Sequence, residues 1–501
     1  MTMHSPYLNV NLDRDSEEPI YRQLIRAIRL QIDSGVLPAG SRLPASRDLA
    51  RQLDISRISV VNAYAELRSE SYLSAHAGRG TFVSRGRQPD DSPVRPTVRA
   101  ENPEVADDRD RSVRELLRLA RKPGVINFSH GTPPKEFIPV HHLKDALNVV
   151  LDRDGADALV YEASEGYGPL RAAIRDYVSS WGISCTSSQV LITGGTQQAV
   201  DLVIQAMLSE GETLVTANPT YLGVIDIART RRLQLYGVPI DEDGMRLDYL
   251  ENYVADHHPK LVYLTPTFQN PTGHVMPLHR RRQLLHLAED YGFTILEDGV
   301  YQEFHYESEP PPPLKALDET GAVIYASGFT KILLPGLRIG YLICDMRHYE
   351  RLARVKASAD ISTPALTQRA LHLMLQRGIL AGQLERNNRE LRFRRDVAIA
   401  AAQKYLPPGC KWHTPKGGLY LWVELPHSGP TAAELFVSAM QMDVAYAIGS
   451  VFHTDGSGSY FMRLNFALPE PDRIEEGFKR IGRAWREVAC DYDIMEKSPL
   501  L

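Results

Sequence analysis

Cysteine is scarce in this 501-residue sequence, which contains only four. They stand singly at positions 185, 344, 410 and 490, so they offer neither a disulfide framework nor the paired spacing of a zinc site, and they fit a reducing compartment such as the cytoplasm. No stretch approaches the roughly 18 consecutive apolar residues of a membrane-spanning helix. The first 14 residues are polar, so we expect no secretory signal peptide.

Net positive charge is also missing from the chain as a whole, whose formal net charge is -5. Residues 20–87 are the exception, because they contain 11 arginines, no lysine and 5 acidic residues, a formal charge of +6. A basic segment on an acidic chain is typical of a nucleic-acid-binding module attached to another domain, although chance clustering on a solvated face gives the same count. The length predicts two or three domains, and the 43% hydrophobic and 24% charged residues are typical of a soluble globular protein.

The N-terminal region has the pattern of a winged helix-turn-helix. Apolar residues recur at helical spacing between Ile20 and Ile32, and Ser46 and Ser56 can each cap a further helix. Strand-like runs at 72–74 and 81–83 enclose a glycine-containing turn, which predicts a small hairpin. Three helices followed by a hairpin form the DNA-binding fold in which the third helix enters the major groove.

The residues at the start of that third helix are suited to DNA contacts. A recognition helix needs small polar or cationic side chains where it enters the groove, and an arginine in the preceding helix or in the wing can reach the phosphate backbone or the minor groove. The predicted DNA-binding residues are Arg47, Ser56, Arg57, Ser59, Asn62 and Arg79. Their expected partner is a double-stranded DNA operator.

Composition divides the whole chain into four segments. Residues 1–85 form the predicted DNA-binding domain, and the polar, proline-rich segment 86–123 reads as a linker because it cannot bury a core. Within it, 112–121 (SVRELLRLAR) either forms a short helix or opens the next domain. A second folded domain is predicted at 124–490, followed by a tail at 491–501.

This second domain alternates continuous apolar runs with helical patterns, which predicts an α/β fold with a mostly parallel sheet covered on both faces. Ligands on such sheets bind at the carboxyl ends of the strands. The strand-like runs lie at 190–193, 213–216, 261–264, 294–296 and 323–326.

The residues that follow these runs match the needs of pyridoxal 5'-phosphate. That cofactor requires a lysine amine for its aldehyde, an acid for its pyridine nitrogen, donors for its phenolate, an aromatic ring to stack on and a phosphate cradle. Lys331 is the candidate catalytic lysine, Asp298 the acid and Tyr221 the stacking ring, while Asn270 and Tyr301 would reach the phenolate. The predicted phosphate cradle consists of Gly195, Thr196, Gln197, Ser327, Thr330 and Arg338.

Two family resemblances rest on these motifs. Residues 37–83 (LPAGSRLPASRDLARQLDISRISVVNAYAELRSESYLSAHAGRGTFV) resemble the GntR-family DNA-binding domain nearly end to end. The motifs of the second domain resemble fold-type I, class I aminotransferases over roughly 124–490. By that resemblance Tyr161 looks like the tyrosine that reaches the cofactor phosphate across a dimer interface, and Arg463 like the arginine that grips a substrate carboxylate.

Both resemblances on one chain match the MocR/GabR branch of the GntR regulators. The branch implies a domain-swapped homodimer whose second domain senses a small amino compound or pyridoxal phosphate itself. The alternative is an active aminotransferase with an accessory DNA-binding domain, because Lys331, Asp298 and Arg463 together permit a transamination half-reaction. A metabolic aminotransferase has no need of a DNA-binding module, and we therefore favour the regulator.

Overall fold

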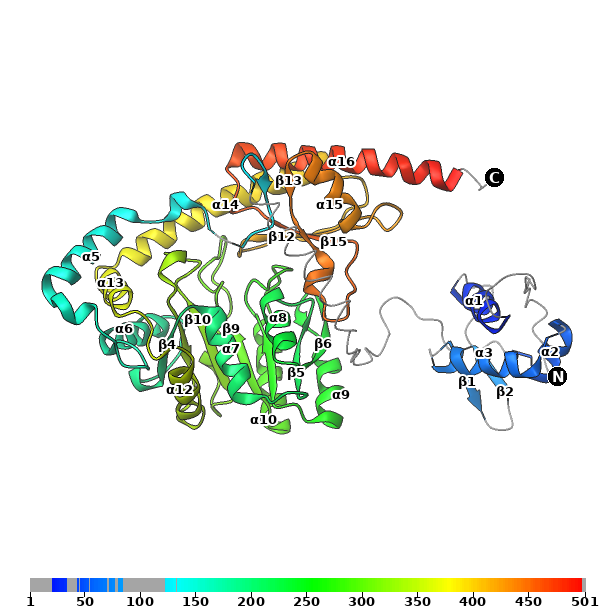
Figure 1. The fold of residues 1–501 in the computed structure, drawn as a ribbon, viewed down its shortest axis with the longest axis horizontal. Coiled ribbons are helices and arrows are strands. Elements are labelled where there is room, and N and C mark those ends of the chain that lie inside the picture. The colour runs from blue at the N-terminus through cyan, green and yellow to red at the C-terminus, as the bar shows by residue number, and fades with distance from the viewer. Residues whose placement is uncertain are drawn as a thin grey trace. The chain divides into compact units, whose positions relative to one another are not determined.

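The computed structural model describes residues 20–33, 43–44, 46–53, 55–69, 72–76, 80–83, 122–131 and 133–497. The chain divides into two compact units, Met1–Pro93 and Val94–Leu501 (Figure 1). Nearly all of the predicted linker, 86–121, lies outside the described residues.

The first unit is a winged helix-turn-helix, as predicted. Its elements are α1 (Ile20–Asp33), α2 (Ser46–Leu53), α3 (Arg57–Ser69), β1 (Leu73–His76) and β2 (Gly80–Val83). The two strands pair antiparallel with Leu73 opposite Val83, which forms the wing hairpin.

The core of this unit fixes the three helices against the hairpin. The predicted inner face of α3, which includes Val60 and Leu67, is buried against Leu24 and Ile28 of α1. The Tyr64 hydroxyl, also on α3, donates to the carbonyl oxygen of Pro44 at 2.9 Å, so the helix is tied to the chain just before α2. Burial of one apolar face is what orients the opposite face of α3 toward solvent.

The second unit is built on an eight-stranded sheet in the order β4-β11-β10-β9-β8-β5-β6-β7. Strands β10, β9, β8, β5 and β6 run parallel to one another, whereas β11 and β7 pair antiparallel with their neighbours. The strands are β4 (Val190–Thr193), β5 (Thr213–Asn218), β6 (Gln234–Asp241), β7 (Gly244–Met245), β8 (Leu261–Leu264), β9 (Thr294–Asp298), β10 (Val323–Gly328) and β11 (Gly340–Ile343).

Helices cover both faces of this sheet. Successive residues of β9 point to opposite faces, and accordingly Leu296 belongs to the apolar cluster under α7, α8 and α12 while Ile295 belongs to the cluster under α9 and α10. This is why the strands are apolar without interruption. The five helices are α7 (Thr196–Met207), α8 (Leu222–Thr230), α9 (Leu247–His257), α10 (Leu278–Tyr291) and α12 (Met346–Asp360).

A smaller part of the second unit contains the antiparallel sheet β12-β15-β14 and the short parallel pair β13-β3. These strands are β3 (Ile126–Asn127), β12 (Tyr420–Glu424), β13 (Val444–Ala445), β14 (Ala447–Ile448) and β15 (Phe461–Asn465). The remaining helices are α5 (Val140–Asp154), α6 (Gly168–Ser179), α11 (Leu314–Leu317), α13 (Ala365–Gln376), α14 (Ile379–Tyr405), α15 (Ala432–Gln441) and α16 (Pro471–Lys497). Helix α16 therefore continues past position 490, where we expected the domain to end.

The five predicted strands are all present, as β4, β5, β8, β9 and β10, and the predicted parallel α/β architecture is confirmed. In the described part of the chain, no helix is long and apolar enough to cross a membrane.

Candidate functional site

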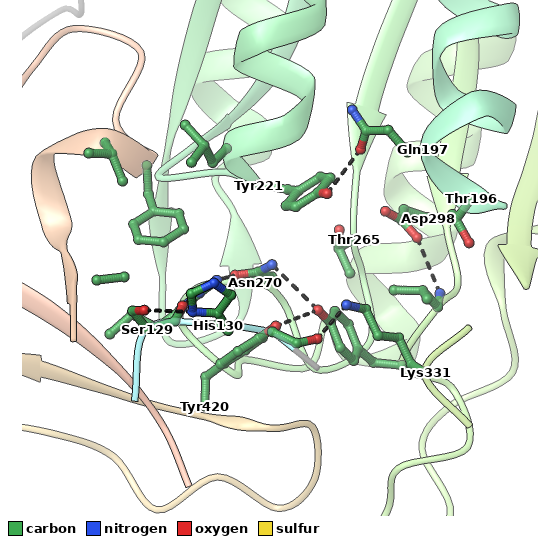
Figure 2. Close-up of a pocket in the computed structure, with 18 of the residues that line it drawn as sticks. Ser129, His130, Thr196, Gln197, Tyr221, Thr265, Asn270, Asp298, Lys331 and Tyr420 are labelled. Carbon is green, nitrogen blue, oxygen red and sulfur yellow. Dashed lines mark hydrogen bonds between the residues drawn. The ribbon is translucent and has the colours of Figure 1, made fainter. Parts of the chain in front are cut away.

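A cavity of about 320 Å³ lies where the large sheet meets the small antiparallel sheet (Figure 2). The large sheet contributes residues at or just beyond the ends of its parallel strands, such as Asp298 on β9 and Lys331 after β10. The small sheet contributes Tyr420 on β12 and Arg463 on β15. The predicted site residues that line the cavity are Thr196, Gln197, Tyr221, Asn270, Asp298, Tyr301, Thr330, Lys331, Arg338 and Arg463.

One end of the cavity is suited to a phosphate group. Thr196 is the first residue of α7, whose N-terminus presents free backbone N–H groups and the positive end of the helix dipole. The hydroxyls of Thr196 and Thr330 are buried without a hydrogen-bond partner in the described structure, and the Arg338 guanidinium lies beside the same turn. Two unpaired hydroxyls, a helix N-terminus and a cation form a built anion site.

Glycine is required at the turn that leads into α7. Gly195 has φ 108° and ψ 166°, a conformation open to glycine almost alone. A Cβ atom placed there would lie 2.6 Å from Nη2 of Arg338. The close approach of the arginine to the turn thus depends on the absence of a side chain.

Tyr221 and Gln197 hold each other in place on one wall of the cavity. The Tyr221 hydroxyl donates to Oε1 of Gln197 at 2.9 Å, and Nε2 of Gln197 donates to the carbonyl oxygen of Gly223 at 3.2 Å (Figure 2). These two hydrogen bonds fix the ring of Tyr221 in the wall of the cavity.

Asp298 is a buried carboxylate held by two donors. Its Oδ2 accepts from the Tyr263 hydroxyl at 2.9 Å and its Oδ1 from the backbone N–H of Val300 at 3.2 Å. Burial raises the pKa of Asp298 to about 6, because the two hydrogen bonds offset only part of the lost hydration. A buried anion of this kind favours a cationic group of the ligand within reach.

Lys331 is half-buried in the wall of the cavity (Figure 2). Its ammonium donates to the carbonyl oxygen of Gly131, which lies four residues beyond the end of β3. Burial lowers the pKa of Lys331, since the charged form loses hydration and Arg463 and Arg338 add repulsion. A lysine with a lowered pKa has a larger fraction of neutral, nucleophilic amine at neutral pH.

Three polar side chains meet opposite Tyr221. Nδ2 of Asn270 donates to the Tyr301 hydroxyl at 3.4 Å, and the hydroxyls of Tyr301 and Tyr420 are 3.0 Å apart. Asn270 and Tyr301 were predicted together as phenolate donors, and the structure brings them together. Burial and the neighbouring Tyr420 hold the pKa of Tyr301 well above its usual value, so its hydroxyl stays protonated.

Arg463 is buried at the junction of the two sheets. Nη1 donates to Oδ1 of Asn270 at 2.8 Å, Nη2 donates to the carbonyl oxygen of Ser129 at 2.7 Å, and Nε is buried without a partner among the described residues. Its guanidinium carbon lies 4.1 Å from the ring centroid of Tyr420 and 4.6 Å from that of Phe452. An unpaired buried N–H typically costs about 1–3 kcal/mol.

Three predicted site residues do not line the cavity. Gly195 lies behind Thr196 in the turn, and the Ser327 hydroxyl donates to the carbonyl oxygen of Gly299 at 3.3 Å instead of facing the phosphate end. Tyr161 is 82% exposed and lies outside the cavity of its own chain.

Several residues in or beside the cavity escaped the sequence analysis. Tyr420 starts a strand two residues after a Gly-Gly pair, and Gly131 lies beyond a short strand near the domain start, but neither motif carries a chemical signature by itself. Tyr263 lies inside an apolar run, and only the pairing of β8 with β9 brings its hydroxyl to Asp298. These contacts depend on strand order, which local sequence does not encode.

In the first unit, the predicted DNA-binding residues are largely accessible. Arg47 on α2, Ser56 and Arg57 are exposed, and Ser59 is half-buried. Asn62 belongs to α3, but its side chain is not described, and Arg79 lies outside the described residues.

The donor set of the second unit fits pyridoxal phosphate. The phosphate end, the buried acid, the half-buried lysine and the phenol–amide pair line one cavity, and their chemistry matches the functional groups of this cofactor. The unpaired hydroxyls of Thr196 and Thr330 mark the phosphate position most directly.

The comparisons with known proteins agree with both units. The family described as bacterial regulatory proteins, gntR family, matches residues 20–83, and the family described as aminotransferase class I and II matches residues 123–481. The uncharacterized HTH-type transcriptional regulator YdcR of Escherichia coli is 31% identical, covering 93% of this chain and 99% of that protein. The 2-aminoadipate transaminase of Thermus thermophilus is 36% identical, covering 74% of this chain and 93% of that protein.

Solved structures show the same fold for the second unit. The Pyrococcus horikoshii kynurenine aminotransferase, whose structure contains PMP, superposes with a TM-score of 0.72 at 33% identity, covering 75% of this chain and 94% of that chain. The aminotransferases thus cover about three quarters of the chain, whereas the regulator covers 93% of it. The chain belongs to the aminotransferase class I and II family and, within it, to the HTH-type regulators that carry a gntR-family domain at the N-terminus.

Proposed function

We propose that the protein is a transcription regulator in which a DNA-binding domain, 1–85, is joined through a linker, 86–123, to a pyridoxal-phosphate-binding sensor domain, 124–490. The observation that carries this proposal is the alignment of the regulator relative over 93% of the chain. A protein that binds operator DNA works where the DNA is, so we propose a cytoplasmic, nucleoid-associated location.

The first domain reads DNA through α3. The exposed Arg57 and Ser56 at its N-terminal end are placed for base or phosphate contacts in the major groove, and Arg47 on α2 for a backbone phosphate. Arginine can bind phosphate oxygens in a bidentate manner. Because each neutralised phosphate releases condensed counterions, the affinity should depend strongly on salt.

The second domain would hold the cofactor through four sets of side chains, one each for its phosphate, its ring face, its pyridine nitrogen and its phenolate oxygen. Thr196, Thr330 and Arg338 would bind the phosphate, and Tyr221 would cover one face of the ring. Asp298 would hold a proton on the pyridine nitrogen, and Asn270 and Tyr301 would donate to the phenolate oxygen. When bound, the cofactor supplies an aldehyde that reacts with primary amines, either with Lys331 or with the amine of an incoming ligand.

This exchange of amines is the proposed sensing event. A ligand amine would compete with Lys331 for the cofactor's aldehyde, and a carboxylate of the same ligand would pair with Arg463 at the junction of the two sheets. A ligand held by both parts of the domain binds some of their relative arrangements better than others, and this difference in affinity is what shifts a conformational equilibrium. Pyridoxal phosphate itself remains the alternative signal.

A homodimer would complete the site. Leu159, Val160 and Tyr161 are 66%, 59% and 82% exposed, so three consecutive apolar or aromatic side chains face solvent in the isolated chain. Such a patch is typical of a protein–protein contact. A second copy covering it would allow Tyr161 to reach the neighbouring cofactor phosphate, in line with the resemblance.

The test measures binding of the full chain to its operator DNA. The operator fragment is first identified by sequencing the genomic DNA that the protein binds. We expect nanomolar to micromolar binding that weakens steeply with salt and that changes when the cofactor is supplied or removed. No sequence-specific binding with or without the cofactor would overturn the proposal.

The second candidate is an aminotransferase with an accessory domain. It is favoured by the presence of Lys331, Asp298 and Arg463 in one cavity, which meets the minimal needs of transamination. Steady-state formation of glutamate from 2-oxoglutarate and an amino acid would support it, whereas a single turnover that stops after one half-reaction fits the sensor.

A further inference from the structure

The hydroxyl of Tyr420 is a polar group in the cavity wall to which the proposed function gives no role. Tyr420 is the first residue of β12, on the small sheet, and its side chain is buried. Its hydroxyl oxygen lies 3.0 Å from the hydroxyl oxygen of Tyr301, which follows β9 of the large sheet (Figure 2). The two rings meet edge to face, with their centroids 5.8 Å apart. This hydrogen bond therefore joins the two sheets inside the cavity.

The partners of the Tyr301 hydroxyl are fixed by a closed ring of side chains. Nη1 of Arg463 donates to Oδ1 of Asn270 at 2.8 Å, which turns the Asn270 amide so that its Nδ2 faces Tyr301. Nδ2 of Asn270 then donates to the Tyr301 oxygen at 3.4 Å. The Arg463 guanidinium lies 4.1 Å from the ring centroid of Tyr420, and this contact closes the ring. Asn270 is thus a donor to Tyr301 and does not take the Tyr301 proton.

The direction of the bond between the two tyrosines depends on what else the cavity holds. A phenol hydroxyl has one proton to donate and two lone pairs that can accept. The Tyr301 proton can go to the Tyr420 oxygen or to an acceptor in the cavity. A negatively charged phenolate oxygen is a stronger acceptor than the neutral hydroxyl of Tyr420. When such an oxygen is within reach, Tyr301 donates to it and Tyr420 donates to Tyr301.

The backbone at Gly131 holds the Tyr420 hydroxyl close to Lys331. A Cβ atom at Gly131 would clash with the Tyr420 hydroxyl oxygen and would lie 3.6 Å from Nζ of Lys331. The carbonyl oxygen of the same glycine accepts from the Lys331 ammonium. The missing side chain at Gly131 therefore lets the hydroxyl approach the lysine that would react with the cofactor.

Several charged groups also act on these hydroxyls and on the lysine. Among the described residues they are Asp298 at the end of β9, Lys331 and Arg338 beyond β10, and Arg463 on β15. Replacement of Tyr420 by phenylalanine alters none of these charges and keeps the ring on which Arg463 packs. A change in proton affinity at the site can then be assigned to the hydroxyl.

We infer that Tyr420 is a positioning residue, whose hydroxyl donates to Tyr301 and thereby directs the Tyr301 proton onto the phenolate oxygen of the cofactor. This role rests on the proposed function, because it requires the cofactor in the cavity with that oxygen facing Tyr301. A donor to an ionised oxygen favours the form without a proton, so the oxygen holds the proton that it shares with the Lys331 nitrogen less tightly. Tyr420 strengthens this effect through Tyr301, because hydrogen bonds in a chain polarise one another.

The experiment follows the cofactor absorbance of the full-length, cofactor-loaded protein as the pH is raised, in the wild type, Tyr301→Phe, Tyr420→Phe and the double variant. Loss of the direct donor in Tyr301→Phe should raise the midpoint by roughly 1–2 pH units, and loss of the supporting donor in Tyr420→Phe by roughly 0.3–1 unit. The double variant should match Tyr301→Phe, because a residue that acts through another has no effect once that other group is gone. Each variant keeps its ring, and the cofactor absorbance reports that the site is intact.

Tyr349→Phe is the matched control. Tyr349 is a buried tyrosine on α12, outside the cavity, and its hydroxyl accepts from Nη2 of Arg171 at 2.9 Å. The variant loses the same group and one hydrogen bond, and its midpoint should equal that of the wild type.

The outcomes that would overturn this role differ in what else they overturn. An unchanged or lowered midpoint in Tyr420→Phe, beside a raised one in Tyr301→Phe, would remove Tyr420 from the relay and leave the proposed cofactor site standing. A double variant whose shift equals both single shifts together would show that Tyr420 acts independently of Tyr301. An unchanged midpoint in Tyr301→Phe would also remove Tyr301 from the phenolate oxygen, and a wild type that binds no cofactor would contradict the proposed function itself.

Discussion

At the scale of single residues, the reactivity expected of the site rests on Lys331, whose side chain is half-buried. Burial and two nearby arginines lower its pKa, while Gly131 gives its ammonium one backbone acceptor. A lysine in this setting is reactive toward an aldehyde without a separate base to deprotonate it.

The first prediction is that Lys331→Ala abolishes covalent attachment of the cofactor. Borohydride reduction followed by mass measurement should give the cofactor adduct on the wild type and none on the variant, while the circular dichroism spectrum stays the same. Lys404→Ala, at an exposed lysine on α14, is the matched control and should retain the adduct. An adduct that persists in Lys331→Ala would assign the bond to another lysine.

The second prediction concerns pH. Because the pKa of Asp298 without a ligand is raised to about 6, the carboxylate is ionised above that pH and protonated below it. A ligand with a cationic ring nitrogen requires the ionised form, so cofactor affinity should fall as the pH drops below about 6, by up to tenfold per pH unit.

Asp298→Asn tests the assignment, because an amide cannot titrate. Its affinity for the cofactor should be lower at pH 7 by about 3–5 kcal/mol, the usual effect of removing one partner of a buried ion pair, and the pH step near 6 should shrink. An unchanged affinity and an unchanged step would remove Asp298 from the site.

At the scale of elements, the turn between β4 and α7 is the most constrained. Gly195 combines a backbone conformation reserved for glycine with an arginine against its Cα, so two separate requirements meet at one residue. Gly211, in the turn before β5, shares the positive φ, at 83°, but has open space where a Cβ would lie.

The third prediction uses this pair. Gly195→Ala and Gly211→Ala should each lower the free energy of unfolding by about 1–3 kcal/mol through backbone strain. Only Gly195→Ala should also weaken cofactor binding, because it displaces Arg338 from the phosphate end. Denaturant unfolding and cofactor titration on both variants separate the two effects, and equal cofactor affinity in both would contradict a phosphate site at this turn.

The elements that could be predicted from the sequence are those whose signal is local. Strand β8 reads as an uninterrupted apolar run because both faces of the sheet are covered, and α3 reads as a helix from its spacing and its preceding serine. Strand β11 was not among the predicted strands, and its antiparallel place between β4 and β10 is decided by tertiary pairing. The same limit decides which site residues can be predicted. Lys331 and Asp298 lie at or after recognisable strands, whereas Tyr420 contacts Tyr301 across 119 residues of sequence.

At the scale of the whole molecule, two functions reside on separate compact units. Sequence motifs sufficed to recognise each unit, because each one matches a family by itself. How a ligand in one unit would change DNA binding by the other cannot be read from a motif, since coupling is a property of conformational equilibria.

The fourth prediction is that DNA binding by the first unit can be impaired without affecting cofactor binding by the second. Arg47→Ala or Arg57→Ala should weaken operator binding by roughly tenfold or more through the loss of a phosphate or base contact, and should leave the cofactor absorbance unchanged. Arg232→Ala, at an arginine in the second unit with a 78% exposed side chain, removes the same charge as a control and should do neither. Operator affinity that survives both substitutions in the first unit would contradict the placement of the recognition helix.

The central claim, that an amino compound on Arg463 regulates DNA binding, is tested most directly by operator affinity with and without each of the twenty standard amino acids on cofactor-loaded wild type and Arg463→Ala. We expect at least one of them to change the wild-type affinity by roughly 5–150-fold, the usual range for allosteric coupling, and to leave Arg463→Ala, which still binds DNA and cofactor, unaffected. An equal response in both proteins would show that Arg463 is not the anchor of the signal. An absence of response to every amino acid in the wild type, with cofactor bound, would contradict the claim and favour pyridoxal phosphate itself as the signal.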